Sequence, residues 1–286
     1  MARTSPIPLE GRRVLITGAA RGIGAGTARR LHERGAHVAL AGLEPDLLER
    51  VAAECGGAPW WACDVTDRAQ VQAAVDGAVE RLGGLDVVVA NAGVVAQLPL
   101  VGGDPAIFER IVAVNLLGVY YTLRAAGPYI AHPRGYALAV ASVAAALHFP
   151  LLGPYNASKA GVEALGDTLR IELHESGARV GVAYFGFIDT DMVRRGMQTR
   201  TAAQAPSRRR AIVKPVPLGL ALDAIERGVQ RRSRHVTAPR WVSAALVLRT
   251  LLQPLVDRGL RGGLSESLEL AREEHAPLTT PQPDLR

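Results

Sequence analysis

The stretch TGAARGIG, residues 17 to 24, joins the apolar run VLIT (14 to 17) to an amphipathic segment at about 22 to 34. A turn that leads from a buried strand into a helix needs glycine where backbone atoms come close together. The helix N-terminus then offers N–H groups and a positive dipole end to a pyrophosphate. The glycines alone leave open a second interpretation, a tight strand-to-helix connection that binds no ligand.

Short apolar runs alternate with longer amphipathic segments along the whole chain. The predicted strands are 14 to 17, 37 to 41, 60 to 63, 85 to 90, 136 to 141 and 179 to 184, and the predicted helices are 22 to 34, 45 to 54, 68 to 82, 104 to 131 and 154 to 175. Continuous apolar strands separated by helices indicate a parallel sheet covered on both faces. We therefore predict an α/β fold, a single doubly wound Rossmann-like sheet of about seven strands, over residues 1 to 272. Such sheets bind ligands beyond the carboxyl ends of their strands.

Composition excludes several classes of protein. With 48% hydrophobic and 21% charged residues, the 286-residue chain is typical of a globular protein. No apolar leader precedes VLIT, so we expect a cytoplasmic protein. Cys55 and Cys63 provide neither a disulfide framework nor metal-ligand spacing. The net charge of +6 could indicate nucleic acid, but the arginines are scattered and few aromatic residues accompany them, so we expect no nucleic-acid partner.

Polar residues follow the later strands, where a ligand would lie. Asp64 and Val65 follow the third run, Asn91, Ala92 and Gly93 follow the fourth, and Ser142 follows the fifth. In addition, Asn115 interrupts the apolar helical stretch IVAVNLLGVYY. A buried carboxamide costs free energy unless it is hydrogen-bonded, so Asn115 is either functional or a core residue that binds backbone.

Four motifs together resemble the short-chain dehydrogenase/reductase family over about residues 10 to 192. TGAARGIG matches its TGxxxGxG cofactor turn, NAG at 91 to 93 its sheet-stabilising motif, and YNASK at 155 to 159 its YxxxK motif, with Ser142 thirteen positions before Tyr155. The resemblance implies a homodimeric or homotetrameric NAD(P)-dependent oxidoreductase. Its reaction would be hydride transfer between an apolar secondary alcohol and a ketone. The alternative is a catalytically silent member that binds a dinucleotide and regulates another process.

The chain uses lysine in only two of its 33 basic positions, Lys159 and Lys214. Tyr155 and Lys159 are four residues apart, so their side chains share a helix face. A phenol with a pKa near 10 is a poor acid-base catalyst at neutral pH, and a nearby ammonium is expected to lower that pKa. The wide planar fork of arginine would fill this compact position less well. A chance pair on an amphipathic helix is the alternative.

The resemblance also implies roles for individual residues. Ser142 would orient the substrate oxygen, Asn115 would hold a water that links Lys159 to solvent, and Asp64 would meet the adenine amino group. The implied catalytic residues are Asn115, Ser142, Tyr155 and Lys159, and the implied cofactor-binding residues are Gly18, Arg21, Gly22, Ile23, Gly24, Asp64, Val65, Asn91, Ala92, Gly93, Tyr155, Lys159, Ile188 and Thr190.

Two departures from the family pattern bear on the cofactor and the substrate. Gly42 stands where NAD-dependent members often carry aspartate, which leaves room for a 2′-phosphate that Arg21 could bind. Two residues oppose this interpretation. Leu43 stands where NADP-dependent members often carry arginine, and the Glu44 carboxylate would repel a phosphate or accept from a ribose hydroxyl instead. The balance favours NADP, with NAD as the alternative. In YFGFIDTDM (184 to 192), Phe185 replaces the usual proline and is expected to change the pocket floor.

Beyond residue 192 the sequence is less informative. A basic substrate loop is expected at about 191 to 216, more simply a solvated loop than a site for an acidic group. The apolar segment 240 to 260 could lie on a membrane surface, cover the active-site mouth or pack against another subunit, and we favour the last two. A loosely ordered tail is expected at 273 to 286. No metal is expected because the histidines lack ligand spacing, and GxSxG, the pattern of a hydrolase nucleophile, is absent around Ser142.

Overall fold

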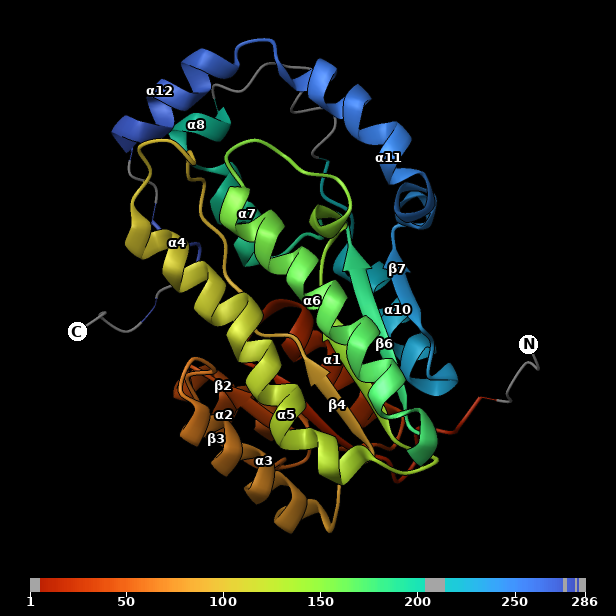
Figure 1. The fold of residues 1–286 in the computed structure, drawn as a ribbon. Coiled ribbons are helices and arrows are strands. Elements are labelled where there is room, and N and C mark those ends of the chain that lie inside the picture. Colours follow the sequence, from red (N-terminus) through yellow and green to blue (C-terminus); the bar gives the residue numbers. More distant parts are fainter. Residues whose placement is uncertain (1–5, 204–213, 275–276, 281, 283–286) are drawn as a thin grey trace.

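A computed structural model describes residues 6–203, 214–274, 277–280 and 282. In this part of the chain, seven parallel strands form one sheet in the order β3-β2-β1-β4-β5-β6-β7 (Figure 1). The strands are β1 (Arg13–Thr17), β2 (His37–Gly42), β3 (Trp60–Ala62), β4 (Val87–Ala90), β5 (Tyr136–Val140), β6 (Arg179–Phe185) and β7 (His235–Ala238). This confirms the predicted fold class. The strand order reverses between β1 and β4, where such sheets bind ligands.

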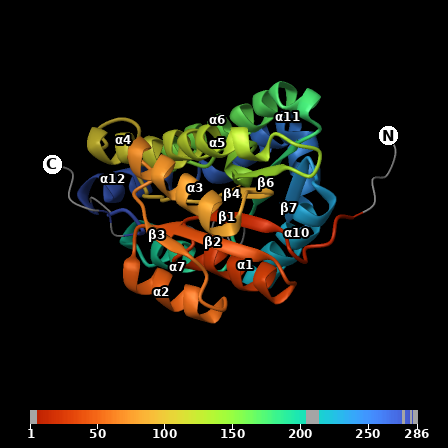
Figure 2. The ribbon, with the colours of Figure 1, turned by 90° about the horizontal axis from the view of Figure 1, so that it is seen from below.

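Helices cover both faces of the sheet. The α-helices are α1 (Gly22–Glu33), α2 (Pro45–Glu54), α3 (Arg68–Leu82), α4 (Pro105–Val112), α5 (Gly118–Ile130), α6 (Gly153–Glu172), α7 (Asp191–Met197), α8 (Arg200–Ala203), α10 (Leu218–Arg231), α11 (Trp241–Leu260) and α12 (Leu264–Glu274). Short turns η1 (Ala113–Leu117), η2 (Val143–Ala145) and η3 (His174–Ser176) join some of them. Helices α1, α2 and α10 lie on one face, and α3, α5 and α6 on the other (Figure 2).

The core is split into two apolar layers by the sheet. Successive side chains of a strand point to opposite faces. Accordingly, Leu15 of β1 packs with residues of α3, α5 and α6, whereas its neighbours Val14 and Ile16 pack with residues of α1, α2 and α10. All three are completely buried. This two-sided burial explains why the strands read as continuous apolar runs.

The stretch predicted as one helix over 104 to 131 is interrupted. Helix α4 ends at Val112, a π-helical turn η1 follows, and α5 begins at Gly118. Asn115 lies in this turn and is completely buried. A π-turn carries one extra residue, which turns a side chain away from the face that regular α-helical spacing would give it. The stretch is thus helical over Pro105–Ile130, as predicted, and the π-turn at Asn115 is a feature that the sequence pattern did not indicate.

The elements beyond residue 190 form one end of the molecule, where α7, α8, α11 and α12 lie beyond the strand ends (Figure 1). The predicted substrate loop contains α7 and α8, and residues 204–213 lie outside the described residues. The apolar segment 240 to 260 is helix α11, which continues through Pro254. Its outer side chains Val247, Leu251 and Leu255 are at least 66% exposed, whereas Leu260 is buried.

One helical stretch among the described residues is long and apolar enough to cross a membrane. It is Pro105–Ile130, not α11. In this structure the stretch packs against α3 and α6 as part of the core. Its apolar character is therefore accounted for by burial within the fold.

Candidate active site

The glycine-rich turn places backbone atoms in close contact at the end of β1. A Cβ on Gly24 would lie 2.1 Å from the carbonyl oxygen of Gly18, and a Cβ on Gly18 would lie 2.7 Å from Cα of Ala92. Gly18 and Gly22 also have positive φ angles of 64° and 56°. No side chain caps the start of α1, so its first N–H groups are available to a ligand. This geometry fits a bound diphosphate.

Asn91 connects the ends of β4 and β1. Its side-chain Nδ2 donates to the carbonyl oxygens of Thr17 at 3.0 Å and Gly18 at 3.2 Å, and its backbone N–H donates to the Thr17 hydroxyl at 3.1 Å. These bonds hold the glycine turn against the neighbouring strand. The NAG motif thus stabilises the edge of the sheet at which the ligand cleft opens.

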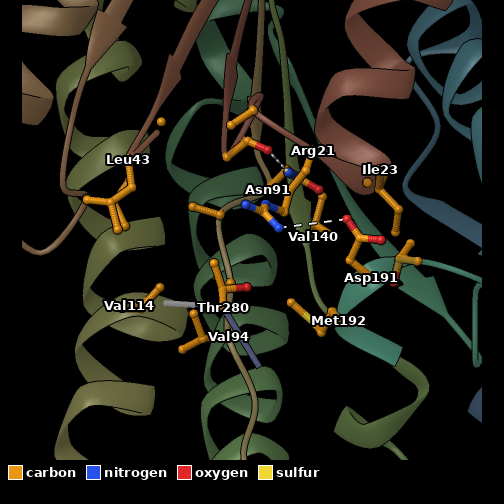
Figure 3. Close-up of a pocket in the computed structure, with 18 of the residues that line it drawn as sticks. Arg21, Ile23, Leu43, Asn91, Val94, Val114, Val140, Asp191, Met192 and Thr280 are labelled. Carbon is orange, nitrogen blue, oxygen red and sulfur yellow. Dashed lines mark hydrogen bonds and ion pairs between the residues drawn. The ribbon is translucent and has the colours of Figure 1, made fainter. Parts of the chain in front are cut away.

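An open cleft runs along this edge (Figure 3). The predicted cofactor residues that line it are Gly18, Arg21, Gly22, Ile23, Asp64, Val65, Asn91, Ala92, Gly93, Tyr155, Lys159, Ile188 and Thr190. Gly24 does not line the cleft, because it packs against Gly18. Of the predicted catalytic residues, Ser142, Tyr155 and Lys159 line the cleft and Asn115 does not.

Tyr155, Lys159 and Ser142 meet at the inner end of the cleft. Helix α6 carries Tyr155 and Lys159, and the Lys159 Nζ lies 5.7 Å from the centroid of the Tyr155 ring. The same Nζ donates to the carbonyl oxygen of Val140 at 2.9 Å. Ser142 follows β5 and is hydrogen-bonded to Tyr155. Its Oγ also accepts from the N–H of Ala144 at 3.1 Å, which fixes its position.

Burial determines the ionisation of this group. Loss of hydration raises the pKa of Tyr155 above its ordinary value, although the hydrogen bond with Ser142 acts in the opposite direction. Burial also lowers the pKa of Lys159 to about 8. The expectation that Lys159 lowers the tyrosine pKa is therefore not met here, because desolvation is the larger cause and only the hydrogen bond with Ser142 acts against it. At neutral pH, Tyr155 is a protonated phenol that can donate a proton.

Asn115 binds backbone rather than lining the cleft. Its Oδ1 accepts from the N–H of Val94 at 2.8 Å, and its Nδ2 donates to the Val94 carbonyl at 2.9 Å and to Ser158 Oγ at 3.2 Å. These bonds join the segment after β4 to α6, which carries Tyr155 and Lys159. The core interpretation of the Asn115 side chain is the one that this geometry supports.

A larger cavity of about 880 Å³ adjoins the cleft and shares Ser142 and Tyr155 with it. Its walls are mainly apolar and come from segments far apart in the chain, and they include Val95, Phe149, Phe187, Met197, Leu260 and Leu278. Phe185, expected to change the pocket floor, is buried at the end of β6 and lines the cleft rather than this cavity. Tyr155 thus lines both the cleft at the end of the sheet and the larger apolar cavity.

Comparison with known proteins agrees with the motifs. The family model for short chain dehydrogenases matches residues 12–201. The chain belongs to the short-chain dehydrogenase family. The relatives found are named as dehydrogenases and reductases, so this short-chain dehydrogenase is an NAD(P)-dependent oxidoreductase.

Three proteins show how far the similarity extends. An 11-beta-hydroxysteroid dehydrogenase 1A of Arabidopsis thaliana is 32% identical over 265 residues, or 88% of this chain and 75% of the relative. A glycine betaine reductase of Emericella nidulans is 39% identical over 207 residues, but these are 70% of this chain and only 16% of that protein. A 3-ketoacyl-(acyl-carrier-protein) reductase from Brucella melitensis, crystallised with NADH, has 29% identity and a TM-score of 0.70, covering 81% of this chain and 99% of its own.

In this short-chain dehydrogenase, Asp64 is engaged by an arginine that sequence reasoning missed. Arg110 of α4 donates from Nη2 to Asp64 Oδ2 at 2.8 Å, while Thr66 donates to Oδ1 from its N–H at 3.0 Å and its hydroxyl at 2.8 Å. Burial opposes ionisation of Asp64, but these hydrogen bonds outweigh it and lower its pKa. The Asp64 carboxylate therefore accepts several hydrogen bonds from within the protein, which leaves fewer acceptor positions for the adenine amino group.

Arg21 is likewise already paired. Its guanidinium makes two hydrogen bonds to the Glu44 carboxylate, one of them from Nε to Oε2 at 2.8 Å. Its Nη1 also lies 3.7 Å from the carboxylate of Asp191, which faces it across the cleft (Figure 3). A carboxylate thus occupies the guanidinium fork that was expected to bind a 2′-phosphate, so the geometry does not support the preference for NADP.

Proposed function

We propose that this chain interconverts a secondary alcohol and a ketone, with Tyr155 as the general acid and base. The observation that carries the proposal is the position of Tyr155. It lines both the cofactor cleft and the apolar cavity, is hydrogen-bonded to Ser142, and shares a helix with Lys159. A substrate oxygen held by Ser142 and Tyr155 would therefore place its carbon beside the cleft.

Each residue has a defined part in this mechanism. A bound nicotinamide dinucleotide supplies the hydride donor or acceptor. In ketone reduction, Tyr155 donates its proton to the developing alkoxide, for which its raised pKa is suitable. Ser142 orients the same oxygen. In alcohol oxidation, the phenolate form accepts the proton, and the neighbouring ammonium of Lys159 favours that form.

We also propose that Asn115 and Lys159 support proton exchange with solvent through a water. A Cβ on Gly93 would lie 3.3 Å from Asn115 Oδ1 and 3.4 Å from Lys159 Nζ, so the two polar atoms approach the same glycine. Because the Asn115 side chain is engaged by Val94 and Ser158, its direct contribution is to hold α6 in place.

We propose NAD(H) rather than NADP(H) as the dinucleotide. Glu44 follows β2 by two residues, lines the cleft and is held by Arg21. A carboxylate can accept a hydrogen bond from a ribose hydroxyl, whereas it repels a phosphate. One solved relative, the Brucella melitensis reductase, was crystallised with NADH.

We propose an apolar substrate with a bulky carbon framework. The cavity is within the usual size range for small-molecule sites, about 300–1,000 Å³, and apolar side chains dominate its wall. A relative named as a hydroxysteroid dehydrogenase supports this class of substrate. The alternative, a catalytically silent member, is less consistent with the meeting of Ser142, Tyr155 and Lys159.

The test is to follow nicotinamide absorbance while screening apolar cyclic ketones and alcohols, and then to examine Tyr155→Phe. We expect turnover to fall by about a thousandfold, since positioned acid-base catalysis contributes roughly 10²–10⁴. The affinity for NADH should stay within threefold. Tyr129→Phe is the matched control, because that tyrosine is exposed and its hydroxyl donates to Asp76, far from the cleft residues. Turnover by Tyr155→Phe within a few-fold of wild type would contradict the assignment.

A further inference from the structure

The segment after α12 lies along both the cofactor cleft and the substrate cavity. Pro277, Leu278 and Thr279 line the cavity. Thr280 and Gln282 line the cleft. The described part of the segment, 277–280 and 282, therefore contributes to the wall of both spaces, and the expectation of a loosely ordered tail does not hold for these residues. Below, they are called the strap.

The first anchor of the strap is Thr279, which is buried. Its N–H donates to the carbonyl of Val95 at 2.9 Å, and its Oγ1 accepts from the N–H of Val95 at 3.4 Å. Its carbonyl accepts from Arg195 Nη1 at 2.9 Å. Val95 follows the NAG motif, and Arg195 belongs to α7. This anchor thus ties together two elements that line the substrate cavity.

The second anchor is Gln282. Its Oε1 accepts from Arg110 Nε at 3.1 Å and from Nη2 at 2.9 Å, and that Nη2 also donates to Asp64. Arg110 is only 7% exposed, so these bonds are shielded from water. Between the two anchors, Thr280 stands at the wall of the cleft near Val94 (Figure 3). The strap is thus linked through Arg110 to Asp64, the residue expected at the adenine end of the cofactor.

We infer that the strap holds the dinucleotide in its cleft and completes the substrate cavity, with the Gln282–Arg110 contact as its latch. This inference rests on the proposed function. Because Thr280 and Gln282 form part of the cleft wall, loosening the Gln282–Arg110 contact should speed the exchange of oxidised for reduced dinucleotide. Gln282 and Thr279 are therefore positioning residues for the cofactor, and Leu278 is a specificity residue for the substrate.

Substitutions of the Gln282 side chain can make the latch weaker or stronger. Gln282→Ala removes both hydrogen bonds from Arg110, and Gln282→Glu converts them into an ion pair, because the acceptor then carries a charge as well as the donor. We measure NADH release by stopped-flow fluorescence, displacing bound NADH with excess NAD. Release should be about tenfold faster in Gln282→Ala and severalfold slower in Gln282→Glu. Gln72→Ala is the matched control, because Gln72 bonds to Asp76 on the exposed face of α3, and its release rate should equal that of wild type.

Two further measurements separate a strap from a merely structural contact. Hydrogen exchange at 277–282 should slow when NADH is added to wild type, and deletion of 277–286 should match or exceed the effect of Gln282→Ala on release. Leu278→Ala should raise the KM for a bulky substrate several-fold without changing NADH release. Equal release rates in Gln282→Ala, Gln282→Glu and wild type would overturn the strap while leaving the proposed function intact. Failure of wild type to bind NADH would instead overturn the proposed function.

Discussion

Glu44→Gln is expected to move the coenzyme preference toward NADPH. In the wild-type chain the Glu44 carboxylate occupies the guanidinium of Arg21, with Nε to Oε2 at 2.8 Å. A glutamine there keeps the shape of the side chain and removes its negative charge. Arg21 then remains cationic without an anionic partner at this position, although Asp191 still lies 3.7 Å from its Nη1. The site would therefore become more favourable for a phosphate.

The size of the effect follows from the charge that is removed. Two anions that share one guanidinium are roughly 5 Å apart, and at an effective dielectric constant of about 20 they repel each other by about 3 kcal/mol. The side chains of Arg21 and Glu44 are each 24% exposed, so solvent screening reduces this value. We expect a gain of about 1.5–3 kcal/mol for NADPH, or roughly 10- to 100-fold in affinity. The affinity for NADH should fall only a few-fold.

Titration by nicotinamide fluorescence measures both affinities without a substrate. The double variant Glu44→Gln with Arg21→Ala is the control, because the gain for NADPH should disappear when the cation is also removed. If Glu44→Gln leaves the ratio of the two affinities unchanged, or if wild type already prefers NADPH, the electrostatic reasoning at Glu44 is wrong. If the gain survives in the double variant, Arg21 is not the group that binds the phosphate.

Three other properties can be tested directly. Because burial raises the pKa of Tyr155, its phenol stays largely protonated in this range, so alcohol oxidation should accelerate as the pH rises above neutral while ketone reduction changes little, and initial rates from pH 6 to 10 measure both. An oxidation rate that does not change with pH would contradict this reasoning. Lys159 has a pKa of about 8 in the folded chain and about 10.4 in the unfolded chain. Between these two pH values the unfolded chain binds more protons at Lys159 than the folded chain does. This group therefore makes the free energy of unfolding rise with pH, by up to about 3 kcal/mol. In urea unfolding at pH 7 and 10, the change of the free energy of unfolding with pH should be more positive in wild type than in Lys159→Met, because both chains share the buried thiols Cys55 and Cys63, whose raised pKa values act in the opposite direction. Gly24→Ala should lower stability by about 2–3 kcal/mol and abolish NADH binding, because the added Cβ would clash with Gly18. Gly127→Ala is the control, because a Cβ there meets no other part of the structure within 4 Å, and its thermal melt should match that of wild type.

Local patterns in the sequence were sufficient for six of the seven strands, and the motifs shared with the family indicated the residues at the inner end of the cleft. The strands are buried on both faces, so their apolar runs are continuous, and the predicted helices at 45 to 54 and 68 to 82 have the observed bounds. Strand β7 was not located, because its four residues, HVTA, are too few to show a pattern. A burial pattern that repeats over a longer element can be recognised in the sequence, whereas an element of four residues is too short to show one.

Contacts between distant segments were the part that sequence reasoning could not supply. Asp64, Arg110 and Gln282 are separated by 46 and 172 residues, and nothing near any of them indicates the other two. The pairing of Arg21 with Glu44 depends in the same way on how the first and second strand ends are placed. These contacts changed the interpretation of the cofactor site, although all the predicted cofactor-binding residues except Gly24 line the cleft.

The use of lysine at position 159 follows from how few acceptors surround it. Arg12 shows what a buried arginine needs in this chain. Its guanidinium donates to three backbone carbonyls, including that of Arg134 at 2.6 Å, and its Nε still has no partner among the described atoms. Lys159 donates to one carbonyl, that of Val140, and Gly93 lies close on another side. A guanidinium with five N–H donors would leave several of them unsatisfied there, so an ammonium is the cation that this position can bury next to Tyr155.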